Sequence, residues 1–274
     1  MVKTRTSKRK SSEAVKQPRA KKGKVRPPEG MAGLAKGLGI IETLGSNRST
    51  LSVSDAARAT GITRPAARRC LLTLTEFGYL VHDGKLFRPT PRLLRIGSAY
   101  LEAAPLPQLA QPFLVSAREE LGESVTLAIF EDGWSVFVAR AEVDRVVTTG
   151  VRLGGRLPAY SSATGRVLLA AMDDESLRRY LAESQFVRTT PHTLVDAGQI
   201  LQRVLDARAQ GYTYTDEEIE LGMRSFAVAV KNAQGRTVAA LSVSAFSARV
   251  SLDRMRRDYL PVLESKARAL GQLL

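Results

Sequence analysis

Residues 53–72, VSDAARATGITRPAARRCLL, predict two short helices that meet at a glycine. Ser52 immediately precedes this stretch, and Asp55 lies three residues after Ser52. This spacing is close to a capping box, in which a hydroxyl and a carboxylate satisfy the free N–H groups of a helix start. The first helix should therefore begin near Val53. It should end at Gly61, because glycine enters the left-handed conformation of a helix terminus at little cost.

The second helix is predicted to begin at Arg64, with Thr63 as its cap and Pro65 in its first turn, where the missing N–H of proline costs nothing. Apolar residues then recur at three- and four-residue spacing, so one stripe of the helix should be buried. That stripe consists of Ala67, Cys70, Leu71 and Leu74. The residues expected on or beside the other faces are Arg64, Ala66, Arg68, Arg69 and Thr73. The outward surface of this helix is therefore cationic, with small side chains between the arginines.

The flanking residues complete a three-helix module with a hairpin. An amphipathic helix ended by Gly45 is predicted before the turn, from the spacing of Leu34, Leu38, Ile41 and Leu44. After Phe77-Gly78, a strand at 79–81, a tight turn at Asp83-Gly84 and a return strand from Leu86 predict a hairpin. Together these elements indicate a winged helix-turn-helix over residues 31–90. Two short helices around a glycine also occur in proteins that never touch DNA, so the hairpin carries much of this inference.

Positive charge gathers in the first third of the chain. Residues 1–30 hold 11 Lys/Arg and 2 Asp/Glu, residues 31–98 hold 10 and 4, and residues 99–274 hold 20 and 21, for a net charge of +14. The basic part is where a polyanion such as double-stranded DNA should bind. The tail of residues 1–30 has almost no apolar side chains and is expected to be disordered. It is either a solubilising extension or an arm that contacts phosphates.

Composition argues against several classes of protein. No run approaches the roughly 18 apolar residues that span a membrane, and the N-terminal segment lacks the apolar stretch of a signal peptide, so a cytoplasmic protein is expected. The single cysteine, Cys70, allows no intrachain disulfide and is expected to be a packed thiol. An enzyme is disfavoured, because His82 and His192 lack metal-ligand spacing and no glycine loop could cradle a phosphate. No catalytic residue, metal or cofactor is expected.

The rest of the chain predicts a linker and a second domain. Residues 91–107 should form a linker helix, with prolines 105 and 107 marking the boundary. Residues 108–274 mix strand and helix patterns and predict an α+β domain with an antiparallel sheet. The helices expected in it are one ending near 121, then 162–172, 173–182, 197–210 and one from 252. The strands expected are 125–130, 136–141, 145–149, 226–231 and 237–244.

The first candidate ligand site in this domain is LPAYSSATGR, residues 157–166. A serine cap opens a helix there, and the free N–H groups of a helix start attract anions such as carboxylates. Ser161, Ser162 and Thr164 add hydroxyl donors. The plainer interpretation is an ordinary capped helix.

The second candidate is TDEEIELGMRS, residues 215–225. Its four acids are typical of a solvated loop. Arg224 and Ser225, however, lead directly into a buried strand, and a planar guanidinium grips carboxylates in two places. Ser242 and Ser244 share one face of the strand that follows.

Taken together, these stretches resemble the IclR family of bacterial transcriptional regulators, from about Leu34 to Leu270. The blocks that carry the resemblance are ATGITRPAARRCLLTL at 59–74, LPAYSSATGRVLLA at 157–170 and GYTYTDEEIELGMRSFAVAVKNAQGRTVAALSVS at 211–244. The first block looks most like the branch that controls protocatechuate, para-hydroxybenzoate and beta-ketoadipate catabolism. The resemblance implies a winged helix-turn-helix joined to a GAF-like α+β domain that binds a small organic acid, in a homodimer or homotetramer.

The resemblance also implies roles for single residues of the second domain. Backbone amides of Ala163 and Thr164 would meet the effector, and Ser225, Ser242 and Ser244 would line its pocket. Thr215 stands where relatives often carry an acid, which leaves the choice of effector open. Arg224 is common at its position in the family, so it could equally be structural.

On the DNA side, the residues expected to contact the operator are Thr63, Arg64, Ala66, Arg68, Arg69 and Thr73 of the second helix, and Arg88 near the wing. Arg64 is best placed for base edges, where arginine pairs with guanine. In this hypothesis, an aromatic or dicarboxylic acid bound to the second domain shifts the spacing of two recognition helices on a two-fold operator. The alternative is a constitutive DNA-binding protein without an effector.

Overall fold

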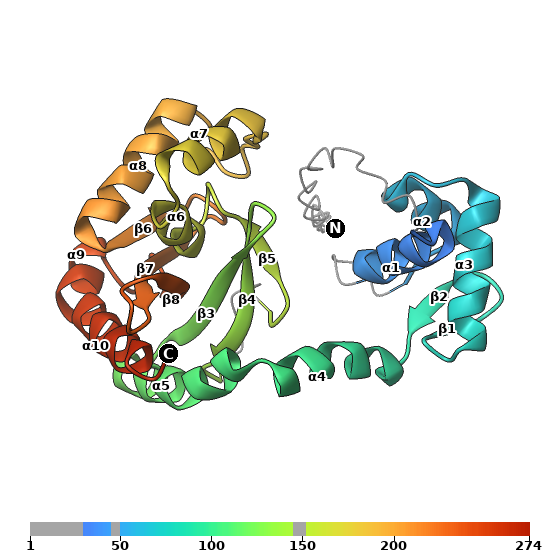
Figure 1. Ribbon diagram of the computed structural model, residues 1–274, viewed down its shortest axis with the longest axis horizontal. Coiled ribbons are helices and arrows are strands. Elements are labelled where there is room, and N and C mark those ends of the chain that lie inside the picture. The colour runs from blue at the N-terminus through green and yellow to red at the C-terminus, as the bar shows by residue number, and fades with distance from the viewer. Residues whose placement is uncertain (1–29, 45–49, 145–151) are drawn as a thin grey trace, which may run out of the picture. The chain divides into compact units, whose positions relative to one another are not determined.

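The computed structural model describes residues 30–44, 50–144 and 152–274 (Figure 1). These residues form two compact units. The first unit consists of the residues up to Glu76 together with Leu80–Arg88. The second unit consists of Phe77–Tyr79 and Pro89–Leu274. The expected basic tail lies almost entirely outside the described residues, as do Gly45 and the strand expected at 145–149.

The first unit has the predicted winged helix-turn-helix. Its elements are α1 (Ala32–Leu44), α2 (Val53–Thr60), α3 (Arg64–Glu76), β1 (Leu80–His82) and β2 (Phe87–Pro89). Both halves of the capping box are present: the Asp55 amide donates to Ser52 Oγ over 3.2 Å, and the Ser52 amide donates to Asp55 Oδ2 over 3.3 Å. Gly61 ends α2 at φ 71°, which explains the glycine at this turn. The two predicted helix starts are therefore confirmed.

Helix α1 buries only part of the apolar face from which it was predicted. Ile40 is fully buried, and Leu44 lies one turn further along the same face. Leu34 and Leu38, which helped to predict the helix, are 61% and 47% exposed and do not pack in the core. Because α1 rests on its neighbours mainly near its C-terminal end, its first turns keep apolar side chains outside the core.

The segment after the wing contains two helices. A short 3-10 turn (Pro91–Leu93) leads into α4 (Leu94–Ala103), and α5 (Pro105–Leu121) follows after one residue. Pro105 and Pro107 belong to the first turn of α5 rather than to a break after a linker that ends at 107. Proline is tolerated there because the first N–H groups of a helix have no partner within the helix.

The second unit is built on a six-stranded antiparallel sheet in the order β5-β4-β3-β8-β7-β6. Its strands are β3 (Ser124–Glu131), β4 (Trp134–Ala141), β5 (Arg156–Pro158), β6 (Tyr212–Asp216), β7 (Met223–Lys231) and β8 (Thr237–Phe246). The α+β class with an antiparallel sheet is confirmed. The short edge strands β5 and β6 were not predicted: β5 has only three residues, but the alternation of Tyr and Thr in β6 is a strand pattern that sequence reasoning missed.

The two faces of this sheet pack against different helices (Figure 1). On the outer face, α5 and α10 (Leu260–Gly271) enclose the main apolar core, which includes Leu114, Leu127, Phe226 and Leu241. On the inner face, α6 (Ala163–Ala170) packs against Ala227 and Ala240. Helices α7 (Asp174–Glu183) and α8 (Ala197–Gln210) cover α6 through a smaller cluster that includes Leu169, Leu177 and Val204. The predicted last helix from Leu252 is present as α9 (Leu252–Arg254), a π-helical turn (Met255–Tyr259) and α10.

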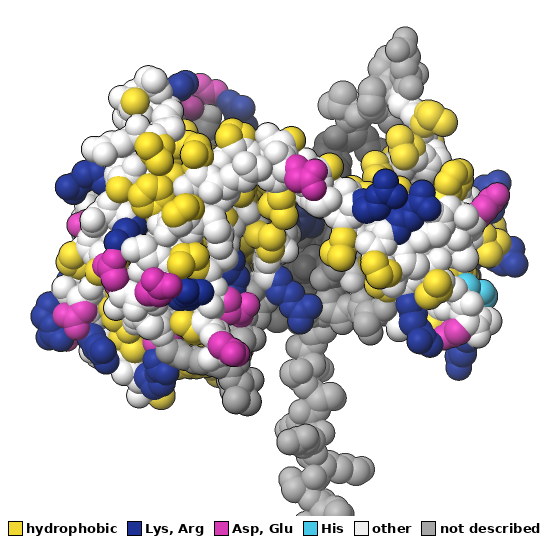
Figure 2. All heavy atoms as spheres, turned by 90° about the horizontal axis from the view of Figure 1, so that it is seen from below, with side chains coloured by type: hydrophobic (Ala, Val, Ile, Leu, Met, Phe, Trp, Pro, Cys, Tyr) yellow, Lys and Arg dark blue, Asp and Glu magenta, His cyan; other side chains and the backbone are white. Residues whose placement is uncertain are grey.

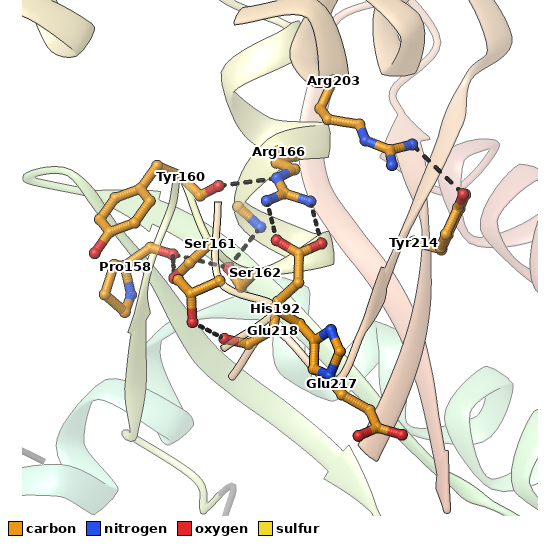
Figure 3. Close-up of polar contacts among 12 residues, drawn as sticks. Pro158, Tyr160, Ser161, Ser162, Arg166, His192, Arg203, Tyr214, Glu217 and Glu218 are labelled. Carbon is orange, nitrogen blue, oxygen red and sulfur yellow. Dashed lines mark hydrogen bonds and ion pairs between the residues drawn. The ribbon is translucent and has the colours of Figure 1, made fainter. Parts of the chain in front are cut away.

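A buried ion pair anchors α6 (Figure 3). The Arg166 guanidinium donates from Nη1 and Nη2 to the two carboxylate oxygens of Glu218 over 2.9 and 2.5 Å, and from Nε to the Tyr160 carbonyl over 2.8 Å. The side chains of Arg166 and Glu218 are 0% and 9% exposed. The Glu218 carbonyl accepts hydrogen bonds from the hydroxyls of Thr189 and Thr193. This clasp joins α6, the segment between β6 and β7, and residues 189–193.

We predict that Glu218→Gln destabilises the second unit by about 3–5 kcal/mol, because it leaves the buried Arg166 guanidinium without a carboxylate. Urea unfolding of the full chain, followed by the fluorescence of the single tryptophan, Trp134 in β4, measures this cost. The control is Glu175→Gln, which removes an exposed pair with Arg179 and should change stability by less than about 1 kcal/mol. Equal unfolding midpoints for the two variants would show that the clasp adds nothing to stability.

Candidate functional site

The exposed face of α3 carries most of the residues expected to contact DNA. Thr63 precedes the helix, and Arg64, Arg68, Arg69 and Thr73 are exposed along it. The helix has no acidic residue before its last position, Glu76. Arg64 and Arg68 are one turn apart and so lie on one side of the helix. The first two turns therefore present three guanidinium groups, and Figure 2 shows Lys and Arg side chains on the surface of this unit.

Ala66 is not on the outward face. It is 8% exposed and belongs to the core of the first unit, beside Ala67 at 0%. This corrects the expectation that Ala66 faces outward: α3 packs on α1 and α2 over a stripe broad enough to include it.

The wing places Arg88 in a local ion pair. Arg88 Nη2 donates to Asp83 Oδ2, and Asp83 Oδ1 also accepts from the amides of Lys85 and Leu86 over 3.1 and 2.8 Å. These bonds, that of the Leu86 amide most of all, lower the pKa of Asp83 from 3.8 to about 2. Arg88 is exposed and could reach a phosphate. That phosphate would have to compete for the guanidinium with the ionised carboxylate of Asp83.

Two rows of polar side chains cross the inner face of the sheet. Residues paired between neighbouring strands share a face, so the register places each row side by side. The first row runs from β6 to β3 through Thr215, Ser225, Ser244 and Ser124. The second row runs from β6 to β4 through Thr213, Ala227, Ser242, Thr126 and Arg140. The three serines expected to line a pocket, Ser225, Ser242 and Ser244, are therefore brought together.

The hydroxyls of these rows are paired with one another. Ser225 and Ser244 are joined by a hydrogen bond of 2.8 Å between their Oγ atoms. Thr126 Oγ1 and Ser242 Oγ are 3.3 Å apart, and both residues are 3% exposed. Each hydroxyl has one proton and two lone pairs, so one bond leaves capacity for another polar partner. Sequence reasoning missed Thr126 and Ser124, although their alternation with apolar neighbours in SVTLA indicates one polar face of a strand.

The first turn of α6 lies over this face. Ala163 forms one apolar cluster with Ala227 and Ala240, and Ala227 belongs to the second polar row. Thr164 Oγ1 accepts a hydrogen bond of 2.7 Å from Ser135 Oγ in β4. A methyl group on Gly165 would come within 2.3 Å of the backbone of Ala159, so only glycine allows this close approach. The start of α6 and the polar rows thus form one candidate site.

Ser161 and Ser162 act within their own turn (Figure 3). The Ser162 hydroxyl accepts from the Gly165 amide over 3.1 Å as the helix cap and donates to the Pro158 carbonyl over 3.1 Å. The Ser161 hydroxyl donates to the same carbonyl over 3.4 Å. Both serines are buried. These contacts match the plainer interpretation of a capped helix for the two hydroxyls.

Arg224 lies on the other face of the sheet. It pairs with Ala245, a member of the outer core, while the next residue, Ser225, faces the polar rows. Its Nε donates to Asp216 Oδ1 over 2.5 Å, and its Nη1 donates to the carbonyls of Ser247 and Val250. The expectation that Arg224 grips an effector is therefore corrected: it holds the segment after β8.

The described ranges contain no cluster of three His, Cys, Asp or Glu side chains that could hold a metal ion. Within the same ranges, no helix is long and apolar enough to cross a membrane. His82 stacks on Phe87 of the wing with ring centroids 4.2 Å apart.

Comparison with known proteins assigns both units. Residues 33–84 match the IclR helix-turn-helix domain, and residues 98–272 match the C-terminal domain of the bacterial transcriptional regulator IclR. The chain is 38% identical over 244 residues to the Pca regulon regulatory protein of Pseudomonas putida, covering 89% of this chain and 84% of that protein. It is 38% identical over 255 residues to the p-hydroxybenzoate hydroxylase transcriptional activator of Acinetobacter baylyi, covering 91% and 94%.

Solved structures agree. A putative transcriptional regulator from Rhodococcus sp. RHA1 matches with a TM-score of 0.77 and 39% identity, over 89% of this chain and 98% of that one. An IclR homolog from Microbacterium hydrocarbonoxydans, complexed with 4-hydroxybenzoate, shares the fold with a TM-score of 0.72 at 24% identity, over 88% and 98%. With both units matched, this chain belongs to the IclR family of bacterial transcriptional regulators and is a DNA-binding regulator, not an enzyme.

Proposed function

We propose that this protein controls genes for the breakdown of hydroxylated aromatic acids, and that such an acid binds where the first turn of α6 meets the two polar rows. The observation that carries the proposal is the set of hydroxyls at Ser225, Ser242, Ser244 and Thr126 on the inner face of the sheet, of which Ser242 and Thr126 are buried and Ser225 and Ser244 half-buried. A hydroxylated ring with a carboxylate has both the apolar and the polar groups that suit this face.

The relatives support the same effector class. The activator from Acinetobacter baylyi is named for p-hydroxybenzoate hydroxylase, and the Microbacterium hydrocarbonoxydans structure holds 4-hydroxybenzoate. We carry this chemistry over to the present chain because its polar rows offer several hydroxyl partners to a phenol. Ala163 and Thr164, at the start of α6, place backbone amides and a small apolar surface beside the same rows.

For DNA, we propose that α3 enters the major groove. Arg64, in its first turn, contacts base edges, and Thr63, Arg68, Arg69 and Thr73 flank it. Arg88 contacts phosphate from the wing in competition with Asp83. Ala66 is left out of this set because it is buried.

A lone winged module reads a short site, so we propose that the protein acts in the cytoplasm as a homodimer or homotetramer. Helix α4 supports pairing between copies, because Leu94, Ile96 and Tyr100 are 74%, 47% and 46% exposed along it. Effector binding can change DNA affinity only as far as the acid binds one arrangement of the dimer more tightly than another. That differential affinity makes the protein a switch rather than a constitutive DNA-binding protein.

We predict that a hydroxybenzoate raises the thermal stability of the second unit and changes operator affinity. A ligand at about 100 times its dissociation constant stabilises the state that it binds by roughly 2.7 kcal/mol. A thermal-shift screen of aromatic and aliphatic carboxylic acids, followed by operator binding with each hit, measures both effects. If no acid stabilises a protein that still binds its operator, the alternative of a constitutive DNA-binding protein is favoured.

We also predict that Arg64→Ala weakens binding to the operator by about 1–3 kcal/mol, and weakens binding to random duplex much less, because a base contact carries sequence information. Both duplexes are titrated at one salt concentration, since phosphate contacts depend on salt. Arg179→Ala, in α7, removes the same charge from an exposed site and serves as the control. Equal losses on the two duplexes would mean that Arg64 contacts only phosphate.

A further inference from the structure

Arg140 is the charged end of the second polar row. It pairs with Thr126, which pairs with Ser242, so its side chain starts on the inner face beside these two hydroxyls. The other members of the two rows are Ser, Thr or Ala. The resemblance to the family implies roles for serines and for the start of α6, and none for Arg140. The strand register alone brings it into the site.

The Arg140 side chain is buried, at 8% exposed, and its Nη2 donates to Glu142 Oε1 over 3.0 Å. Glu142 is 47% exposed. Removing a guanidinium from water is costly unless charged or polar groups surround it. Arg166 differs from Arg140 in this respect. Its partner, Glu218, is itself buried and accepts hydrogen bonds from Arg166 through both carboxylate oxygens. Glu142, the carboxylate that binds Arg140 Nη2, instead lies at the surface, where water solvates it readily once it is displaced.

We propose that Arg140 binds the carboxylate of the effector, and that the effector displaces Glu142 from it. The proposal rests on the proposed function and specifies how its site recognises an acid. A planar guanidinium binds a carboxylate through two parallel hydrogen bonds, which an amide cannot match because half of its polar edge is a donor. The exchange of one carboxylate for another keeps Arg140 paired throughout.

The rest of the acid then lies across the strands. Strands β4 and β8 are separated by β3, and two strand spacings are roughly 10 Å. In this proposal the aromatic ring crosses β3, so that the group on its far side points toward Ser244 on β8. A ring hydroxyl there meets an existing hydroxyl pair that can accept a further hydrogen bond. Ala227 and Ala163 offer apolar contact between the two polar ends. The effector class is therefore a monocarboxylate with a hydroxyl on the opposite side of its ring.

The test compares 4-hydroxybenzoate with its neutral isostere, 4-hydroxybenzamide, by isothermal titration of the full-length protein. Wild type should bind the acid more tightly than the amide. Arg140→Gln should weaken acid binding by about 10- to 100-fold, the usual range for a charged hydrogen-bonded pair, and change amide binding only a few-fold. Arg179→Gln, at an exposed site of equal charge, should change neither.

Glu142→Gln gives a second measurement that does not depend on the folding of the Arg140 variant, because Glu142 is exposed. Removal of the competing carboxylate should tighten acid binding several-fold, because the acid no longer has to displace it from Arg140. The inference is overturned if acid affinity is the same in wild type and Arg140→Gln, or if Glu142→Gln weakens acid binding. Wild type that binds neither hydroxybenzoates nor other aromatic acids would instead overturn the proposed function, and this inference with it.

Discussion

The bidentate ion pair between Arg166 and Glu218 is the interaction on which the second unit depends. It is buried, and it joins residues that are 52 positions apart in the chain. The guanidinium loses its hydration on folding, and three hydrogen bonds to Glu218 and Tyr160 offset that loss only while all of them hold. The pair therefore fixes the first turn of α6 over the sheet. Gly165 permits the same approach sterically, because any side chain there would strike the backbone of Ala159.

The sheet serves two purposes because successive side chains of a strand point to opposite faces. Phe226 and Leu241 join the outer core under α5 and α10, while their neighbours Ser225 and Ser242 face inward. Buried hydroxyls such as that of Ser242 stabilise less than apolar side chains would, and pairing with another hydroxyl offsets much of that difference. We interpret the inner face as a part of the sheet kept polar for a ligand, with stability supplied by the outer core.

The first unit depends on shorter-range contacts. The capping box at Ser52 and Asp55 and the left-handed Gly61 set the angle between α2 and α3. Leu51 bridges to Phe87 through backbone hydrogen bonds of 2.9 and 2.8 Å, so the residue just before α2 is tied to the wing. The small core of the first unit is sufficient to hold α3 in place. Most of the residues proposed to contact DNA need only a rigid helix that presents them to solvent.

Sequence alone determined what local chemistry controls: the helix starts at Val53 and Arg64, the glycine turn, the bounds of α8, and, through three motif blocks, the family. The tertiary structure decided what depends on pairing between distant strands. Adjacent Arg224 and Ser225 looked like one site, but a strand sends them to opposite faces. Arg140 reaches the polar rows only because β4 pairs with β3 in this register, and Arg166 is buried only because Glu218 meets it. Spacing along one segment does not specify the register of its partner, so these residues could be placed only once the sheet was assembled.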